Sequence, residues 1–331
     1  MTEARKIILV TGGAGFVGSH ACKALSAAGY QPVVYDNLSR GHREAVKWGP
    51  LIEGDILDRP RLEQVLNEIK PAAVMHFAAF AYVGESMATP SMYFDNNVTG
   101  TARLLEAMEA AGCRTLVFSS SCAVYGGVHG TPIDESTPCD PSSFYGQTKL
   151  NCEQLIRGFV RSHGFSAIAL RYFNAAGSDP DGEIGENHDP EPHIIPVVLR
   201  VAAGLDPIVT LNGSDHPTPD GTCVRDFVHV SDLAHAHGLA VARALQGVGK
   251  LEIFNLGVGR GFSLNEIVEA ARRVTGRDIS VRYTDRRPGD PPYAVGKADH
   301  AQSTLGWKPQ HTEIEISLRH AWRWMLQSHK L

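Results

Sequence analysis

The stretch TGGAGFVG, residues 11–18, decides the fold because of the segments on either side of it. The apolar run KIILV (6–10) that precedes it is typical of a short buried strand. The run SHACKALSAAG (19–29) that follows has the apolar spacing of a helix. Glycines at such a junction allow a sharp turn and leave the first N–H groups of the helix available to a phosphate. The stretch therefore predicts the first unit of a dinucleotide-binding sheet.

Three glycines carry this prediction. Gly12, Gly15 and Gly18 have the spacing GxxGxxG, one residue away from the usual GxGxxG pattern. The spacing alone is a weak signal, but its place between a strand and a helix makes it specific. We interpret the segment as a phosphate-binding loop, with a plain glycine-rich turn as the alternative.

Strand and helix patterns alternate from this loop to Asn174. Expected strands are QPVVYD (31–36), AAVMHFAA (72–79), RTLVFSSS (114–121) and FSAIALRYFN (165–174), and expected helices lie at 61–69, 99–112 and 142–162. This alternation is typical of an α/β protein with a parallel sheet covered by helices on both faces. We therefore expect a Rossmann-type doubly wound parallel sheet over residues 1–174.

The composition changes after Asn174. Residues 175–222 are rich in Pro, Gly, Asp and His and hold only short apolar runs. We expect residues 175–331 to form a smaller substrate-binding lobe, and the segment at about 224–255 is a candidate to pack back on the first sheet. No Ser/Gly linker separates the two parts, so they should form one body with a cleft between them.

Composition and charge argue against several classes of protein. The chain has 331 residues, 43% of them hydrophobic, and a net charge of −5, without a basic run for nucleic acid or a lysine-rich face for a membrane. The first apolar run is too short for a membrane span or signal sequence.

The six cysteines contain no CxxC pair, so we expect reduced thiols in the cytoplasm. His235 and His237 would face different sides of a helix, so we expect no metal site.

An acidic residue indicates which dinucleotide is bound. Asp36 ends the second expected strand, and its carboxylate can accept hydrogen bonds from a ribose diol while repelling a 2′-phosphate. This favours NAD over NADP. Arg40 is expected to be a solvated loop residue. Asp55, in GDILD (54–58), either meets the adenine or is an ordinary turn aspartate.

The segment SSFYGQTK (142–149) supplies candidate catalytic groups. Tyr145 and Lys149 stand four residues apart, on one face of an expected helix. Outside a dinucleotide fold this is usually an exposed turn with a solvated lysine. Beside an ammonium the phenolate is favoured, and lowering a tyrosine pKa from about 10 to about 7 requires about 4 kcal/mol. Ser121 ends the strand 114–121, where parallel sheets place active sites, and could relay a proton or simply cap a turn.

Together these motifs resemble the extended short-chain dehydrogenase/reductase superfamily and, within it, the UDP-glucose 4-epimerase family. The resemblance covers nearly the whole chain. It rests on TGGAGFVGSH (11–20), YDNLSRG (35–41), GDILD (54–58), HFAAFAYVGES (76–86), YFDNNVTGT (93–101), SSSCAVYG (119–126), YGQTK (145–149), LRYFNAAG (170–177), DGTCVRDFVHVSDLA (220–234) and RRPGD (286–290). Each motif alone is common, whereas the combination is highly specific.

The resemblance implies roles for individual residues. It implies Ser121, Tyr145 and Lys149 as the catalytic set. For NAD it implies Gly12, Gly15, Phe16, Val17, Gly18, Asp36, Asn37, Asp55, Ile56, Phe77, Ala78, Ala79, Asn96, Ser119, Tyr145, Lys149 and Phe173. For the UDP-sugar it implies Ser121, Tyr145, Asn174, His193, Arg225, Arg287, Asp290 and Ala294. Arginine suits this task because its planar fork can engage phosphate oxygens.

Two positions bear on specificity. The family often has a lysine near the nicotinamide where this chain has Ala81, which removes one cofactor contact. A position four residues after Asp290 lines the sugar pocket in the family, and a bulky tyrosine there tends to exclude N-acetylated sugars. Counting without a gap gives Ala294, whereas a slip of one residue would give Tyr293.

The activity that the resemblance implies is the NAD-dependent interconversion of UDP-glucose and UDP-galactose, in carbohydrate and specifically galactose metabolism. Tyr145 would take the proton of the sugar 4-hydroxyl while hydride leaves C4. The transient 4-keto sugar would then turn and receive hydride on its other face. The family also implies a homodimer, formed through helices near 95–112 and 146–162.

Other functions share parts of this pattern. A related epimerase could act on UDP-N-acetylglucosamine or a UDP-pentose. A sugar-nucleotide dehydratase needs an Asp-Glu pair after the strand that carries Ser121, where this chain has Cys122 and Ala123. A non-enzymatic NAD-binding regulator could keep the glycine loop without the catalytic set, all of which is present here.

Overall fold

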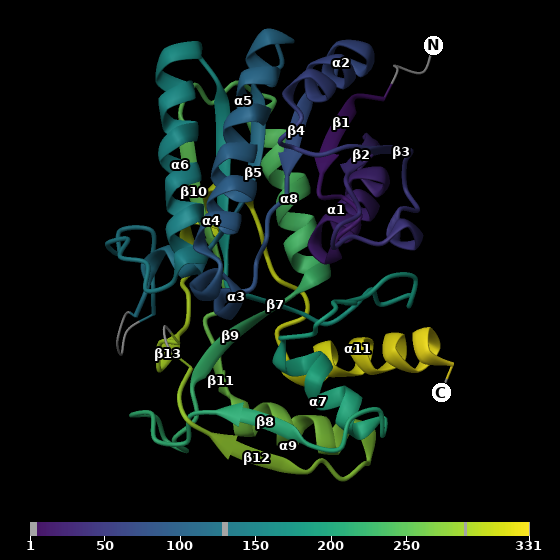
Figure 1. Ribbon diagram of the computed structural model, residues 1–331, viewed down its shortest axis with the longest axis vertical. Coiled ribbons are helices and arrows are strands. Elements are labelled where there is room, and N and C mark those ends of the chain that lie inside the picture. The colour runs from purple at the N-terminus through teal and green to yellow at the C-terminus, as the bar shows by residue number, and fades with distance from the viewer. Residues whose placement is uncertain (1–4, 128–131, 288–289, 331) are drawn as a thin grey trace.

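The computed structural model describes residues 5–127, 132–287 and 290–330, and divides them between two lobes (Figure 1). The larger lobe is built on one sheet of seven parallel strands, in the order β10-β6-β5-β4-β1-β2-β3. These strands are β1 (Ile7–Thr11), β2 (Gln31–Asp36), β3 (Leu51–Glu53), β4 (Ala73–His76), β5 (Thr115–Ser121), β6 (Ser166–Tyr172) and β10 (Leu251–Leu256). The expected Rossmann-type doubly wound sheet is therefore confirmed.

Helices cover both faces of this sheet because alternate residues of its strands are apolar on both sides. In β1, Ile8 and Val10 belong to one buried cluster and Leu9 to another. The first cluster includes residues of α1 (Phe16–Ala27) and α8 (Val230–Ala244), and α10 (Asp299–Leu305) packs at the same side. The second includes residues of α2 (Arg59–Ile69), α5 (Gly100–Ala110) and α6 (Phe144–His163).

Several elements end earlier than the apolar runs suggest. The strand expected at 72–79 stops at His76, because the N–H groups of Phe77 and Ala78 both donate to the carbonyl of Thr11 at 2.8 and 3.1 Å. The chain thereby leaves the ladder at the carboxyl edge of the sheet.

Before α5 lie two short helices, α3 (Val83–Ala88) and α4 (Pro90–Tyr93), and a π-helical turn, Phe94–Thr99. These short elements were not expected from the sequence.

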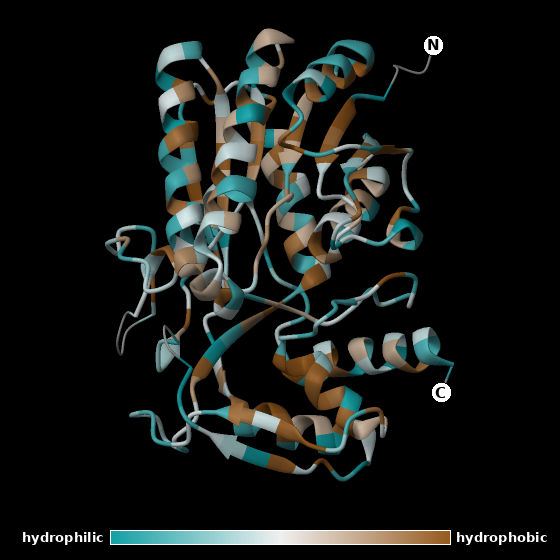
Figure 2. Ribbon diagram, in the orientation of Figure 1, coloured by the Kyte–Doolittle hydropathy of each residue, from teal (hydrophilic) through white to brown (hydrophobic). Residues whose placement is uncertain are grey.

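The smaller lobe has its own apolar core. Its helices are α7 (Ile194–Ala202), α9 (Leu264–Thr275) and α11 (Ile314–His329), which pack beside the parallel pair β8 (Val209–Asn212) and β12 (Val281–Thr284). Figure 2 shows the hydrophobic residues concentrated in α7 and in the interior of both lobes. Within the described residues, no helix combines the length and apolar character needed to cross a membrane.

A second small sheet lies between the lobes. Its central strand β9 (Val224–His229) pairs with β7 (Asn174–Ala176), β11 (Gly261–Ser263) and β13 (Tyr293–Ala294). After β9 the chain returns to the large sheet as α8 and β10, and β10 pairs with β6 (Figure 1). Part of the segment 224–255 thus packs on the first sheet, while β9 joins the residues that face the cleft.

Candidate active site

A cavity of about 930 Å³ lies where the carboxyl edge of the large sheet meets the smaller lobe. The glycine loop, the ends of β2, β4, β5 and β6, and residues of both lobes line it. The strand order reverses at β1, which has β2 on one side and β4 on the other. Ligands of open α/β sheets bind at such a switch point. The cavity is therefore the candidate active site.

The loop requires glycine at two positions because larger side chains have no room between the loop, α1 and Ala78. Gly12 has φ +74, and a Cβ on it would lie 2.5 Å from the nitrogen of Ala78. A Cβ on Gly18 would lie 2.2 Å from the carbonyl oxygen of Gly12. Gly15 stands at the N-cap of α1 and has no side chain to cap the first N–H groups of the helix. Those groups and the helix dipole form a phosphate cradle at the cavity wall.

The carboxylate of Asp36 is fixed by the loop it faces. It accepts hydrogen bonds from the N–H groups of Ala14 at 3.0 Å and Leu38 at 2.9 Å. Burial raises the pKa of this carboxyl group, while both backbone hydrogen bonds act in the opposite direction. Asp36 lines the cavity next to the loop, where it can receive the two hydroxyls of a ribose.

Arg40 is not the solvated loop arginine that we expected. Its guanidinium pairs with Glu85 at 2.7 Å and lies over the rings of Phe80 and Tyr82, at 4.4 and 4.7 Å from their centroids. A carboxylate and two aromatic faces stabilise the cation there. Because Arg40 is engaged in these contacts, it is not free to select a 2′-phosphate.

Asp55 has the geometry of a turn residue. One carboxylate oxygen accepts from the N–H of Leu57 at 2.8 Å, and the other accepts from the side chain of Asn37 at 2.9 Å. It lines a smaller hollow that adjoins the main cavity, together with Asn37 and Asn96. Asp55 therefore has the contacts of a turn aspartate, which was one of its two expected roles. Its place in the smaller hollow also puts it beside the main cavity, as the other role, contact with the adenine, would require.

Strand β5 and helix α6 bring the predicted catalytic residues together. Ser121 ends β5, and Tyr145 lies in the first turn of α6; both line the cavity. Ser143 caps this helix by accepting from the N–H of Gly146 at 3.1 Å. Lys149 is buried behind Tyr145, with its Nζ 5.9 Å from the centroid of the tyrosine ring. The ammonium donates to the carbonyl oxygen of Ser119 at 2.7 Å.

Burial shifts the pKa of both members of this pair. It raises the pKa of Tyr145, and the hydrogen bond from Ser121 only partly opposes that rise. Burial also lowers the pKa of the Lys149 ammonium to about 8. Burial therefore disfavours the charged form of both groups, and a positive charge bound in the cavity would favour the Tyr145 phenolate.

The wall opposite the sheet carries the residues predicted to hold the substrate. Asn174, His193, Arg225, Arg287, Asp290 and Ala294 all line the cavity. The guanidinium of Arg225 lies 3.8 Å from the carboxylate of Asp290. The side-chain amide of Asn174 donates to the backbone carbonyl of Asp226 at 3.0 Å, which fixes its orientation. Pro288 and Gly289 of the RRPGD motif lie outside the described residues.

The two candidates for the sugar-pocket gate lie differently. Both form β13, which runs parallel to β9, with Tyr293 opposite Val224 and Ala294 opposite Arg225. Ala294 lines the cavity and is 6% exposed, whereas Tyr293 is not among the described residues that line it. Successive residues of a strand point to opposite faces, so only one of the two can face the sugar. In the structure Ala294 is the one that faces the cavity.

Most of the predicted cofactor residues also line the cavity. They are Gly12, Gly15, Phe16, Val17, Gly18, Asp36, Asn37, Ile56, Phe77, Ala78, Ala79, Asn96, Tyr145 and Phe173. Two predicted residues, Ser119 and Lys149, are buried behind this wall instead. They sit one layer below Tyr145, and through their hydrogen bond they connect the end of β5 to α6.

The sequence analysis missed three charged residues around His193. Glu186, His188 and Glu191 also line the cavity, and their side chains meet that of His193. Burial opposes ionisation, but the facing charges prevail: the pKa of both histidines is raised and that of Glu186 is lowered. A signal was present, because residues 186–193 contain five side chains that can carry a charge, namely Glu186, His188, Asp189, Glu191 and His193.

Comparisons with known proteins agree with this geometry. Residues 8–257 match the family described as the NAD dependent epimerase/dehydratase family. The UDP-glucose 4-epimerase of Rhizobium meliloti is 49% identical over 317 residues, which are 96% of each chain.

Two solved structures also resemble the chain. The structure of UDP-glucose 4-epimerase from Brucella ovis in complex with NAD is 47% identical, covers 96% of this chain and 97% of its own, and has a TM-score of 0.92. The Bifidobacterium longum enzyme in complex with NAD+ and UDP is 34% identical, with 98% and 99% covered and a TM-score of 0.93. This chain belongs to the NAD dependent epimerase/dehydratase family and, within it, to the UDP-glucose 4-epimerases.

Proposed function

We propose that this protein interconverts UDP-glucose and UDP-galactose by epimerisation at C4 of the sugar, with NAD as its cofactor. One observation carries the proposal. A single cavity holds the glycine loop and Asp36, the Ser121–Tyr145 pair, and a wall with Arg225 and Asn174. A dinucleotide, a base and a nucleotide-diphosphate site in one cavity are what a reversible oxidation of a UDP-sugar requires.

The residues of the loop fit NAD. Gly12 lets the loop pass close to Ala78 and Gly18 lets α1 pack against the loop, so that the start of α1 would receive the charge of the pyrophosphate and Asp36 the adenosine ribose. When bound, NAD would supply a hydride acceptor and donor for C4 of the sugar and the positive charge of its oxidised ring. Because hydride is returned in each cycle, the cofactor does not need to leave.

We assign the proton transfer to Tyr145. Its phenolate takes the proton from the sugar 4-hydroxyl, and the phenol so formed gives the proton back after the 4-keto sugar has turned. Ser121 shares a hydrogen bond with Tyr145 and can hold the proton between substrate and base. Lys149 is a positioning residue and a charge partner, because its ammonium lies behind the phenol and is fixed to the carbonyl of Ser119.

The substrate must be held at its UDP end and remain loose at its sugar end. Arg225 and Arg287 offer planar guanidinium groups for the diphosphate, and Asp290 restrains Arg225. Asn174 and His193 complete this wall. The sugar can then turn about its bond to the pyrophosphate while the UDP stays in place.

The residues after β5 do not support a dehydratase. At that position the chain has Cys122, and burial raises the pKa of its thiol to about 12. The thiol therefore stays protonated at neutral pH and cannot serve as a base. Ala123 carries no proton-transfer group. At positions 122 and 123 the chain therefore has neither the acid nor the base that expulsion of the 6-hydroxyl requires.

The identity of the bound nucleotide tests the cofactor assignment. We expect purified protein, once denatured, to release NAD and no NADP, because Asp36 repels a 2′-phosphate and Arg40 is engaged with Glu85. Chromatography of the released nucleotide against both standards is the measurement. Release of NADP alone, together with failure to bind added NAD, would show the assignment to be wrong.

The small side chain of Ala294 predicts that the protein accepts more than one class of UDP-sugar. Its small side chain leaves room beside the sugar, so we expect measurable epimerisation of UDP-N-acetylglucosamine as well as UDP-galactose. Ala294→Tyr should abolish the first activity and preserve the second, because the ring fills the space of the acetamido group. Product analysis with both substrates checks this. Wild-type protein that converts UDP-galactose but leaves the N-acetylated sugar unchanged would mean that other residues close the pocket.

We further propose that the protein is a cytoplasmic homodimer formed through α5 and α6. Met92 and Phe94, just before α5, are 37% and 43% exposed and offer two apolar side chains close together in sequence for such a contact. The cytoplasm suits six cysteines that are all unpaired. Light scattering on the purified protein should give twice the chain mass, and a single chain mass at micromolar concentration would refute the dimer.

A further inference from the structure

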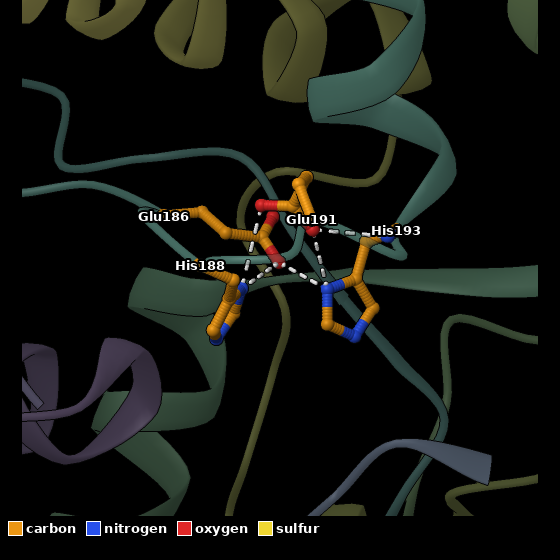
Figure 3. A group of neighbouring side chains, drawn as sticks. All are labelled: Glu186, His188, Glu191 and His193. Atoms are coloured by element: carbon orange, nitrogen blue, oxygen red, sulfur yellow. Dashed lines mark hydrogen bonds and ion pairs between the residues drawn. The ribbon is translucent and has the colours of Figure 1, made fainter. Parts of the chain in front are cut away.

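Four side chains converge on one side of the cavity, beside the predicted UDP site. They are Glu186, His188, Glu191 and His193, and one ligand atom from each lies within 4.8 Å of the others (Figure 3). Figure 3 shows both imidazole rings with Nδ1 directed at the two carboxylates and the other ring nitrogen directed away. All four come from the eight residues that lead into α7.

The two carboxylates are buried without a lysine or arginine partner, although one oxygen of Glu191 accepts from the backbone N–H of His193 at 2.9 Å. The side chains of Glu186 and Glu191 are 5% and 9% exposed. In the described part of the chain, neither forms an ion pair with lysine or arginine, and Arg200 nearby pairs with Asp206. Two buried negative charges require two positive charges in contact. Two protonated imidazoles would supply them, and so would one divalent cation held by two neutral imidazoles.

The distances between the groups are close to those around a shared metal ion. Nδ1 of His188 lies 3.2 Å from a Glu186 oxygen and 3.4 Å from a Glu191 oxygen. Zinc binds nitrogen and oxygen ligands at about 2.0–2.2 Å in a tetrahedron, whose edges are then about 3.3 Å. Nδ1 of His193 lies closer, at 2.8 Å from the Glu186 oxygen and 2.9 Å from the other Glu191 oxygen, which are hydrogen-bond distances, so this ring must shift slightly to admit an ion.

One ligand atom has no other partner. Nδ1 of His188 is fully buried and makes no well-directed hydrogen bond within the described residues, although both carboxylates are near. Its ring is packed between Phe16 and Tyr82, with centroids at 6.3 and 5.8 Å, so it cannot turn away freely. The nitrogen therefore faces the space between the carboxylates, as a metal ligand would.

We propose that Glu186, His188, Glu191 and His193 form a site for a divalent transition-metal ion of the zinc type. Neutral imidazole and carboxylate are ligands that zinc accepts in a tetrahedral site. Binding displaces two protons from the histidines, so the charge of the cluster is unchanged. All four positions are filled by the protein, so the ion is structural and takes no part in the hydride or proton transfer.

The site would position a residue of the substrate wall. Binding through Nδ1 leaves Nε2 of His193 as a fixed N–H donor, directed away from the carboxylates (Figure 3). The ion would also join the segment 186–193 to the cofactor side, because His188 packs against Phe16 at the start of α1. Metal binding would thereby hold the two walls of the cavity together.

A second group of carboxylates differs from this one because a lysine already lies among them. Asp179, Asp181 and Glu183 also lie close together. The ammonium of Lys23 already sits among them, at 2.8, 2.8 and 2.6 Å. A lysine occupies the place of a cation there, whereas no such side chain occupies the centre of the Glu186–His193 group among the described residues.

Metal content tests the proposal without relying on activity. Untagged protein is dialysed against Zn²⁺, then against metal-free buffer, and analysed by plasma mass spectrometry. We expect about one zinc per chain in the wild type. Glu186→Gln and His188→Asn should bind zinc at least about 100-fold more weakly, the upper range for loss of an outer-shell partner. His163→Asn and Glu68→Gln, which change exposed residues of α6 and α2, are matched controls and should keep it.

A second measurement does not depend on the variants folding. Wild-type protein stripped with a chelator and loaded with Co²⁺ should show the intense visible absorption of a tetrahedral site, and Zn²⁺ should displace it. A wild type that retains no zinc, or that gives the weak spectrum of octahedral Co²⁺, would overturn the proposal. So would folded Glu186→Gln and His188→Asn proteins with the zinc content of the controls.

Discussion

Replacing Tyr145 with phenylalanine should lower the turnover of UDP-galactose by about 100-fold or more, because it removes the group that exchanges the proton with the sugar 4-hydroxyl. The ring itself stays in place, since its apolar part is packed in the cavity wall beside Ser121. Steady-state rates, measured with saturating substrate, give the effect. Binding of UDP should change little, because Arg225 and Asn174 lie on the opposite wall.

This result separates a catalytic role from a structural one. A calorimetric titration with UDP serves as the control, together with the NAD content of the variant. If the phenylalanine variant binds UDP and NAD normally and also turns over at nearly the wild-type rate, Tyr145 is not the base. Loss of all three properties together would instead indicate that the hydroxyl stabilises the fold of the cavity.

Gly18→Ala should nearly abolish the binding of NAD. The new methyl group would lie 2.2 Å from the carbonyl oxygen of Gly12, a distance that real contacts do not allow, so the loop must move away from the helix. We expect the affinity for NAD to fall by about 100-fold or more, which corresponds to about 2.8 kcal/mol. Fluorescence titration with the apoprotein measures it.

The chain offers a matched control for this substitution. Gly158 lies in α6, and a Cβ built on it meets nothing within 4 Å. Gly158→Ala should leave NAD affinity unchanged and raise the melting temperature slightly, because alanine is favoured over glycine in a helix by about 1 kcal/mol. Normal NAD affinity in Gly18→Ala would show that the cofactor does not rest on this loop.

The sheet could be predicted because its strands are apolar on both faces and are separated by helices with clear periodicity. The expected strand 31–36 is β2 to the residue, and Asp36 ends it at the edge where a ribose would bind. The short elements between β4 and α5 could not be predicted, because they depend on contacts with distant residues. Tyr93, for example, is buried by packing and by a hydrogen bond to Glu85.

The geometry of the site was harder to predict from the sequence than the fold was. Tyr145 and Lys149 could be paired by helical spacing, but their burial, which raises one pKa and lowers the other, depends on the whole lobe. The contacts of Arg40 with Glu85 depend in the same way on how two loops fold together. Glu186 meets His193 only because a loop without helical or strand periodicity folds back on itself.

The return of one hydrogen to the carbon that lost it is the most direct test of the proposed epimerisation. Protein as purified, without added nucleotide, is incubated with UDP-galactose that carries deuterium at C4, and the UDP-glucose formed is analysed by mass spectrometry and NMR. We predict UDP-glucose with the deuterium retained at C4, because the hydride never leaves the cavity. A product with ordinary hydrogen at C4, a 4-keto-6-deoxy sugar, or no conversion by NAD-loaded protein would contradict the account.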